Sequence, residues 1–425
     1  MSKGEYTKAE IITIGDELLY GHTVDTNAAF ISEAITAAGA QVVWRTTVGD
    51  NVDLIVEAIA RAMQRSELVI ATGGLGPTND DLTKKAICKY FKRQLVFHDD
   101  VLKKIEERFK ARGVSMPAIN QNQALLPQGA EFIENEIGSA VGIALAEDGS
   151  LFVALPGIPD EMRLMVSGWV AEQIRRRAGN FAIIHRRIKT TGIFESALYE
   201  KIADLVENRG GYQDGDKISV AFLPSWRGVE IRLTIASEDP SEGRRQLAEL
   251  EARIAERIGD YIFGYDEETL PGTVGRLLKE KGATLAVAES CTGGLVGKLL
   301  TDTPGSSEYF VGGIIAYSNE LKVGLLNVPE ALLQKHGAVS EQCAIAMAEG
   351  ARAKMGTTLA ISVTGIAGPD GGTPDKPVGL VFIGLAAPGK SKVMEHKLGG
   401  GRERNRERSA TLALDMVRRH LQGIE

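Results

Sequence analysis

The feature that most constrains the fold is a regular alternation of short apolar runs with amphipathic helical patterns. In the first third of the chain, β-branched runs alternate with helical patterns, the runs at residues 10–14, 41–47 and 68–72 and the helices at residues 26–38, 51–65 and 80–90. Such alternation predicts a mostly parallel sheet with helices on both faces. Two later apolar runs, residues 141–145 and 151–155, flank Asp148-Gly149 and predict a β-hairpin.

The middle of the chain shows a different order of predicted elements. They run strand, helix, strand, strand, helix, strand, at residues 188–191, 195–206, 217–222, 229–235, 243–258 and 261–263. This order predicts a small α+β module that resembles a KH domain. The Gly-x-x-Gly loop with which KH domains clamp RNA is absent, because Gly210, Gly211 and Gly215 have the wrong spacing. We therefore expect a spacer that sets the geometry of the outer domains, not an RNA-binding module.

A third segment begins near Pro271 and returns to alternating strands and helices. Strands are predicted at residues 283–288, 314–317, 358–364 and 378–385, and helices at residues 273–280, 340–354 and 404–421. A chain of 425 residues is long enough for two or three domains. We predict a three-layer α/β domain at residues 1–178, the α+β module at residues 179–266 and an α/β domain at residues 267–425.

Charge and cysteine content narrow the classes of function and the compartment. The formal net charge is -7, and nucleic-acid affinity depends mainly on basic groups that neutralise phosphates, so nucleic-acid partners are not expected. The three cysteines are far apart and the six histidines lack zinc-site spacing, which argues against disulfides and against a zinc site. The opening residues lack an apolar signal segment, and no run approaches the ~18 apolar residues of a membrane span. We expect a cytoplasmic protein with no membrane partner.

Ser290 is the clearest candidate for chemistry. It lies in the segment AVAESCTGGLVG, residues 286–297, where it follows a predicted strand and precedes Gly293, Gly294 and a predicted helix. This arrangement exposes a hydroxyl at the carboxyl end of a strand, beside free backbone N–H groups that can hold a developing oxyanion. The segment is not a phosphate-binding P-loop, because Thr292 stands where the first glycine of that motif belongs.

A serine nucleophile needs a base, and the segment AYSNELK at residues 316–322 offers Tyr317 and Lys322 at the end of a predicted strand. A lysine partly removed from water has a lowered pKa and can accept the serine proton, which a tyrosine can relay or orient. Cys291 is a competing nucleophile, because a thiolate is more reactive than a hydroxyl. Successive residues leaving a strand point in opposite directions, so only one of the pair faces the pocket, and we favour Ser290.

Further loops complete a predicted anion pocket. The loop TGIAGPDGG begins at Thr364 after a predicted strand, and the loop GGGR ends at Arg402 before the last helix. An arginine at a helix N-terminus binds phosphate or carboxylate well, and Ser307 adds a hydroxyl. A nucleophile, a base and an anion clamp together predict an amidohydrolase that acts on a small phosphorylated amide.

Taken together, these C-terminal motifs resemble the C-terminal domain of the CinA family, the nicotinamide mononucleotide deamidases. The resemblance rests on AESCTGG, PGSSEYF, GGIIAYSNELK, HGAVSE, TGIAGPDGG and GGGR, in this order. It implies hydrolysis of nicotinamide mononucleotide to nicotinic acid mononucleotide and ammonia, with no cofactor in this domain. It also implies a nucleophile at Ser290 activated by Tyr317 and Lys322. Substrate-binding residues would be Ser307, Thr364, Arg402, Gly293 and Gly294.

The N-terminal segment carries a second set of polar loops. They are GDELLYG at residues 15–21, DTN at residues 25–27, Gly49-Asp50, and TGGLGPTNDD at residues 72–81. All follow predicted strands or open helices, so they cluster at the carboxyl edge of the sheet, where glycine N–H groups bind phosphate. Asp50, Asp80 and Asp81 suit a divalent cation. A purely structural reading stays open, in which Asp80 and Asp81 only favour a helix dipole.

With LPGIPDEM and GIFES, these loops resemble the molybdopterin-binding fold of the MoaB and MogA proteins, so nearly the full chain resembles a full-length CinA protein. The resemblance implies a metal-dependent ADP-ribose pyrophosphatase in the N-terminal domain, small phosphorylated nucleotides as ligands, and a homodimer. The implied nucleotide-binding residues are Glu17, Asn27, Gly73, Gly74, Gly76 and Thr78. The implied cofactor is a divalent metal on Asp50, Asp80 and Asp81, alone or with a monovalent cation.

Two rival functions stay open at this point. The N-terminal fold also suits a molybdopterin-related binding protein, which would bind pterin without turning over ADP-ribose. The family name also suggests a competence or DNA-damage factor without enzymatic activity, acting through protein or DNA partners. The acidic charge gives that second rival little support, and tight, salt-sensitive DNA binding would revive it.

Overall fold

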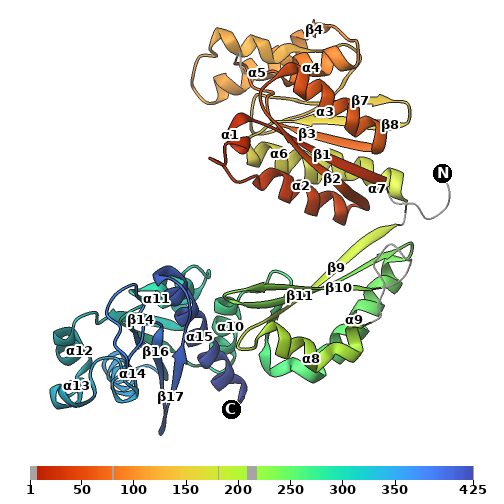
Figure 1. The fold of residues 1–425 in the computed structure, drawn as a ribbon. Helices are drawn as coiled ribbons and strands as arrows, with labels where there is room; N and C mark the ends of the chain where they lie inside the picture. The colour runs from red at the N-terminus through yellow and green to blue at the C-terminus, as the bar shows by residue number, and fades with distance from the viewer. Residues whose placement is uncertain (1–6, 79–80, 180, 208–217, 425) are drawn as a thin grey trace. The chain divides into compact units, whose positions relative to one another are not determined.

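A computed structural model describes residues 7–78, 81–179, 181–207 and 218–424 (Figure 1). The chain divides into two compact units. The first contains the described residues up to 184 together with residues 235–245, and the second contains the other described residues. The predicted domain boundaries after residues 178 and 266 stay predictions. None of the helices in the described ranges combines the length and the apolar composition needed to cross a bilayer.

The first unit is built on a six-stranded sheet with the order β2-β1-β3-β8-β7-β6. Its strands are β1 (Thr7–Ile14), β2 (Ala40–Val48), β3 (Leu68–Thr72), β6 (Glu131–Ile133), β7 (Gly142–Glu147) and β8 (Ser150–Leu155). Strand β1 pairs in parallel with β2 and β3, β3 pairs in parallel with β8, and β7 pairs antiparallel with β6 and β8. Asp148 and Gly149 both have positive φ, as a two-residue hairpin turn requires. The mostly parallel sheet and the hairpin are therefore confirmed.

Helices cover both faces of this sheet (Figure 1). One face carries α2 (Thr26–Ala37), α6 (Pro159–Met165) and α7 (Ala171–Ala178), and the other carries α3 (Val52–Arg65), α4 (Thr83–Tyr90) and α5 (Asp99–Ala111). Side chains alternate along a strand, so Ile11 of β1 packs in the core under α2, α6 and α7, and Ile12 packs in the core under α3, α4 and α5. The short helix α1 (Asp16–Leu19) follows β1 directly.

One part of the first unit has no counterpart among the predicted elements. Beyond α4, the strands β4 (Leu95–Phe97) and β5 (Leu125–Pro127) pair with each other in a separate two-stranded sheet, joined through α5 and the 3-10 helix η1 (Ala118–Ala124). Strands of three residues are too short to show an alternating pattern in sequence.

The middle module has the predicted βαββαβ order. Its elements are β9 (Ala182–Thr190), α8 (Glu195–Val206), β10 (Ser219–Ser225), β11 (Gly228–Ser237), α9 (Pro240–Ile258) and β12 (Ile262–Tyr265). They form a four-stranded sheet with the order β10-β11-β9-β12. Part of the acidic loop that carries Gly210, Gly211 and Gly215 lies outside the described residues.

The C-terminal sheet has the order β14-β13-β15-β16-β17. Its strands are β13 (Leu285–Glu289), β14 (Phe310–Ile315), β15 (Leu359–Gly365), β16 (Leu380–Ala387) and β17 (Lys390–Lys397). Strands β14, β13 and β15 run parallel, whereas β16 and β17 are antiparallel additions. Strand β17 was not predicted, because its sequence KSKVMEHK lacks an apolar run. Charged side chains are typical of edge strands, where they discourage pairing with another chain.

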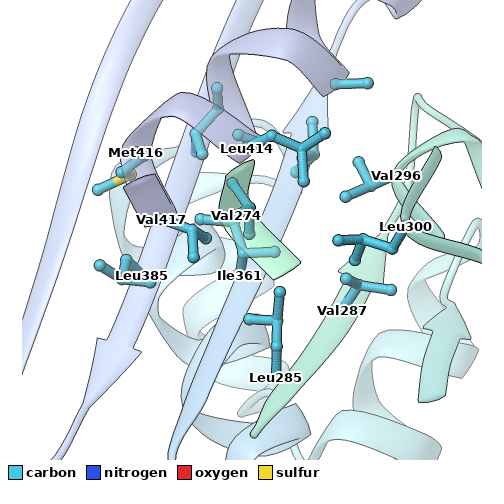
Figure 2. Close-up of a cluster of buried hydrophobic side chains, with 14 of the residues drawn as sticks. Val274, Leu285, Val287, Val296, Leu300, Ile361, Leu385, Leu414, Met416 and Val417 are labelled. Carbon is cyan, nitrogen blue, oxygen red and sulfur yellow. The ribbon is translucent and has the colours of Figure 1, made fainter. Parts of the chain in front are cut away.

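The C-terminal core lies on both faces of this sheet. Helices α10 (Leu270–Glu280), α11 (Leu295–Thr301) and α15 (Arg402–Gln422) cover one face, and α12 (Asn319–Leu326), α13 (Glu330–His336) and α14 (Glu341–Met355) cover the other. Figure 2 shows Ile361 of β15 beside Val417 of α15, and Val287 of β13 beside Leu300 of α11. Burying each such side chain contributes about 1.5–3 kcal/mol, so this core holds the second half of α15 against the sheet.

Candidate active site

Five predicted residues meet at the carboxyl ends of the parallel C-terminal strands. Ser290 follows β13, Tyr317 lies just beyond β14, and Thr364 is near the end of β15. Lys322 lies in α12, and Arg402 begins α15. The parallel register carries the loops to one edge of the sheet, as the sequence predicted.

Lys322 and Ser290 form the chemical centre of this site. The Nζ of Lys322 lies 3.2 Å from the Oγ of Ser290 and also donates to the carbonyl oxygens of Ala316 at 2.9 Å and Tyr317 at 3.1 Å. Lys322 is 1% exposed and Ser290 is 9% exposed. Burial lowers the pKa of the Lys322 ammonium, because a buried charge loses its hydration.

This geometry makes the lysine a suitable base. Among the described ion pairs, none includes Lys322, so no carboxylate neutralises it at close range. Once the amine is neutral, the two carbonyl groups can hold its N–H groups. Its lone pair is then free to accept the proton of Ser290 as the oxygen attacks.

Tyr317 connects the lysine to the arginine, and among the described residues no hydrogen bond joins its side chain to Ser290. The guanidinium of Arg402 donates to the Tyr317 hydroxyl at 3.1 Å and to the carbonyl of Gly368 at 2.9 Å. The Tyr317 side chain is 58% exposed, so it lies on the solvent side of the site. The Tyr317 carbonyl therefore accepts a hydrogen bond from Lys322, and the Tyr317 hydroxyl accepts one from Arg402.

Gly293 and Gly294 are turn residues, and the N–H groups of both are hydrogen-bonded within the turn. Both have left-handed φ angles, 60° and 93°, which let the chain turn sharply between β13 and α11. The N–H of Gly293 donates to the Ser290 carbonyl at 3.1 Å, and the N–H of Gly294 donates to the Glu289 carboxylate at 3.0 Å. Within the described turn, the N–H groups of Cys291 and Thr292 have no acceptor in another residue.

Of the predicted substrate-binding residues Thr364 and Ser307, the structure places Thr364 near Ser290 and Ser307 far from it. Thr364 is buried, and its hydroxyl donates to the Ala338 carbonyl at 2.7 Å, so it fixes the HGAVSE loop. Ser307 lies before β14, whose first residue pairs with the first residue of β13. A strand of this length spans about 16 Å, so Ser307 lies at the far end of the sheet from Ser290. Within one chain, the structure therefore does not place Ser307 at the site.

In the first unit, a pocket of about 170 Å³ collects three of the predicted nucleotide-binding residues, Glu17, Asn27 and Gly73. The Nδ2 of Asn27 donates to the Gly157 carbonyl at 2.7 Å, and its Oδ1 is buried without a partner among the described residues. An unpaired buried acceptor costs free energy, so it is a natural contact for a ligand that donates a hydrogen bond. Thr72 also lines this pocket.

The glycine loop after β3 is organised by Asp81. One carboxylate oxygen accepts from the N–H of Gly76 at 2.7 Å, and the other accepts from the N–H and the hydroxyl of Thr78 at 2.8 and 2.5 Å. The N–H of Gly73 donates to the Leu155 carbonyl. Of the predicted phosphate-binding residues in this loop, only Gly74 keeps an N–H without an acceptor in the described structure.

The described residues do not assemble the predicted metal site. Asp50 and Asp16 accept hydrogen bonds from each other's backbone N–H groups, and both Asp81 oxygens are bonded within the loop. No group of three metal-binding side chains occurs in the described part of the chain. Asp80 lies outside the described residues.

Models of known protein families match three consecutive parts of the chain. The family model "CinA C-terminal domain" matches residues 267–421, "Probable molybdopterin binding domain" matches residues 10–176, and "Damage-inducible protein CinA KH domain" matches residues 185–264. A CinA-like protein of Cytophaga hutchinsonii is 41% identical over 417 residues, which cover 98% of this chain and 99% of that protein. The chain belongs to the CinA family. The predicted molybdopterin-binding-like and KH-like domains are thereby confirmed.

Other CinA relatives show the same coverage or match only one domain. A CinA-like protein of Salinibacter ruber is 43% identical over 415 residues, which cover 97% of this chain and 99% of that protein. The solved competence/damage inducible protein CihA from Agrobacterium tumefaciens is 38% identical. It covers 36% of this chain and 93% of its own, with a TM-score of 0.35.

The structure also separates the two candidate nucleophiles of this CinA domain. Cys291 belongs to the C-terminal apolar core, and burial raises the pKa of its thiol to about 12. Cys291→Ala is therefore expected to keep most of the catalytic activity, within about threefold of the wild type, because the thiol is buried in the core and stays protonated. Turnover of the variant and iodoacetamide labelling of the folded wild type measure this. Loss of turnover in a folded Cys291→Ala, with Ser290→Ala still active, would reverse the assignment.

Proposed function

We propose that the C-terminal domain hydrolyses the carboxamide of nicotinamide mononucleotide to nicotinic acid mononucleotide and ammonia. The observation that carries the proposal is the 3.2 Å approach of the buried Lys322 amine to the Ser290 hydroxyl. A strand-end serine with a base of lowered pKa is the arrangement that nucleophilic catalysis needs. The CinA resemblance supplies the substrate.

The proposed reaction proceeds in two steps. In the first, the Ser290 oxygen attacks the amide carbon and its proton moves to Lys322. Collapse of the tetrahedral adduct breaks the C–N bond, and Lys322 returns the proton to the leaving ammonia. In the second, water attacks the ester carbon and gives a proton to Lys322. The C–Oγ bond then breaks, Lys322 returns that proton to Oγ, and the acid product leaves as the carboxylate after losing its own proton to water.

Arg402 is proposed to bind the substrate phosphate. Its guanidinium is exposed beside the site and is held by Gly368 and Tyr317, and arginine pairs well with phosphate. Ammonia release from nicotinamide mononucleotide is compared with release from nicotinamide riboside, which lacks the phosphate. We expect kcat/KM to fall by about 10²-fold or more without the phosphate. No release from the mononucleotide by folded wild type would refute the proposal.

The pH dependence follows from the lowered pKa of Lys322. The base works only when unprotonated, and a lower pKa increases the neutral fraction at any given pH. Below that pKa, kcat/KM should therefore rise about tenfold per pH unit and then level off. The plateau should begin below about pH 10.4, the ordinary lysine value. A pH series of kcat/KM checks this, and a rise that continues past that value would contradict the role of a buried amine.

We propose that the N-terminal domain binds a small nucleotide and acts as an ADP-ribose pyrophosphatase, as the resemblance implies. The pocket of Glu17, Asn27 and Gly73, with its unpaired Asn27 acceptor, supports nucleotide binding. The divalent metal remains part of the proposal through the resemblance only, and no step is assigned to it. Chelator-sensitive release of AMP from ADP-ribose would support the proposal. Pterin binding without such release would favour the molybdopterin-related alternative.

A further inference from the structure

The residue before the nucleophile is a buried carboxylate with an unusual set of partners. Glu289 ends β13 and is 1% exposed. One of its oxygens accepts from the N–H groups of Gly294 at 3.0 Å and Val296 at 3.1 Å, and the other accepts from Gly297 at 2.9 Å. No basic side chain pairs with Glu289 among the described ion pairs. Three backbone N–H groups therefore stabilise its charge.

A second side chain holds the same turn from another helix. The guanidinium of Arg406 donates to the carbonyl of Thr292 at 2.7 Å. Arg406 lies one turn after Arg402 on α15, and its bond spans 114 positions in sequence. The four-residue turn from Ser290 to Gly293 is therefore held in three places. The Ser290 N–H is bonded to strand β15, and Arg406 binds the Thr292 carbonyl within the turn. Glu289 binds the N–H groups that follow the turn.

From these contacts we infer that Glu289 and Arg406 are positioning residues that hold the Ser290 turn so that its hydroxyl faces Lys322. The inference rests on the proposed serine mechanism and adds the groups that make the serine reactive. The Oγ of Ser290 has one described side-chain partner, Lys322, so its position depends on the backbone of the turn. Misplacing a reacting atom by about 1 Å can cost on the order of 10²-fold in rate.

Glu289→Gln removes one acceptor without changing the size of the side chain. Both carboxylate oxygens accept N–H bonds, whereas an amide has a single oxygen and places an NH₂ group against a backbone N–H. The turn must then shift. We expect kcat to fall by about 10²-fold with KM within about twofold, because Arg402 and the phosphate site are untouched.

Arg406 offers a graded second test. Arg406→Met cannot donate to the Thr292 carbonyl, whereas Arg406→Gln keeps an NH₂ donor and should recover part of the loss. Arg404→Met removes the same charge from an exposed position of the same helix. Glu308→Gln, at the opposite end of the sheet, controls for loss of a carboxylate. Both controls should behave as the wild type.

The deciding experiment measures the reactivity of Ser290 without the nucleotide. An alkyl fluorophosphonate labels an activated serine: the Oγ–P bond forms, the P–F bond breaks, fluoride leaves, and Lys322 takes the hydroxyl proton. Mass spectrometry of the labelled peptide gives the rate. We expect Glu289→Gln and Arg406→Met to be labelled at least about 10-fold more slowly than wild type, with Arg406→Gln between them.

Labelling of Glu289→Gln and Arg406→Met at the wild-type rate would overturn the inference. If Glu289→Gln does not fold, as judged by circular dichroism, the Arg406 series carries the test. A wild type that is labelled at Ser290 but releases no ammonia from nicotinamide mononucleotide would sink the proposed substrate. The slower labelling of the variants would still support the positioning role.

Discussion

Lys322→Met is expected to lower kcat for ammonia release by at least about 10³-fold, the range seen when a general base is lost. The Nζ of Lys322 is the side-chain group placed 3.2 Å from Ser290 to take its proton. Methionine keeps the apolar stem and removes the amine. The fold should survive, because replacing a buried ionisable group with an apolar one of similar volume is often neutral or stabilising.

Two control variants distinguish loss of the base from loss of a positive charge and from loss of the fold. Lys335→Met removes an exposed lysine of α13 and should leave kcat unchanged. Lys322→Arg keeps a cation but cannot be deprotonated near neutral pH, so it should be as inactive as methionine. A folded Lys322→Met that retains more than about a tenth of the wild-type kcat would exclude Lys322 as the base.

Arg418→Met is expected to destabilise the second unit by about 3–5 kcal/mol, the usual effect of removing one partner from a buried ion pair. Arg418 is 0% exposed. It donates to the Asp415 carboxylate at 2.7 Å and to the carbonyls of Asp260 at 2.8 Å and Ile262 at 3.0 Å. It therefore joins α15 to the end of the middle module. Burial raises the pKa of Asp415, so this carboxyl tolerates the loss of its partner poorly.

Urea unfolding monitored by Trp226 fluorescence measures this effect. The chain has three tryptophans, and Trp44 and Trp169 lie in the first unit. Replacing these two with phenylalanine leaves a signal from the second unit alone. Combining Arg418→Met with Asp415→Leu should recover part of the stability, because an apolar pair replaces the stranded carboxyl. A loss below about 1 kcal/mol for Arg418→Met would show that the pair contributes little.

Sequence patterns predicted the bounds of helices and strands that have a clear apolar run or an amphipathic period. Residues 68–72 and 195–206 were predicted with the boundaries that β3 and α8 have. The patterns also placed Ser290, Tyr317, Lys322, Thr364 and Arg402 at one edge, because loops after parallel strands share an edge. The three-residue strands β4 and β5 and the charged edge strand β17 gave no such pattern.

Sequence patterns do not show which group bonds to which. A Gly-Gly pair after a strand indicates a tight turn, but it does not say that Glu289 captures the N–H of Gly294. Ser307 was carried over by motif, although its segment precedes β14 and lies at the amino end. Within one chain, this order of motif and strand separates Ser307 from Ser290. The contact of Arg406 with Thr292 joins distant positions, and local pattern does not encode such pairs.

Ammonia release from nicotinamide mononucleotide by the wild type and by Ser290→Ala, each with and without chelator, tests the proposed deamidase most directly. A serine mechanism predicts chelator-resistant release by the wild type and a loss of at least about 10³-fold in the folded variant. Release that persists in Ser290→Ala, or that disappears with chelator, would contradict a serine nucleophile activated by Lys322.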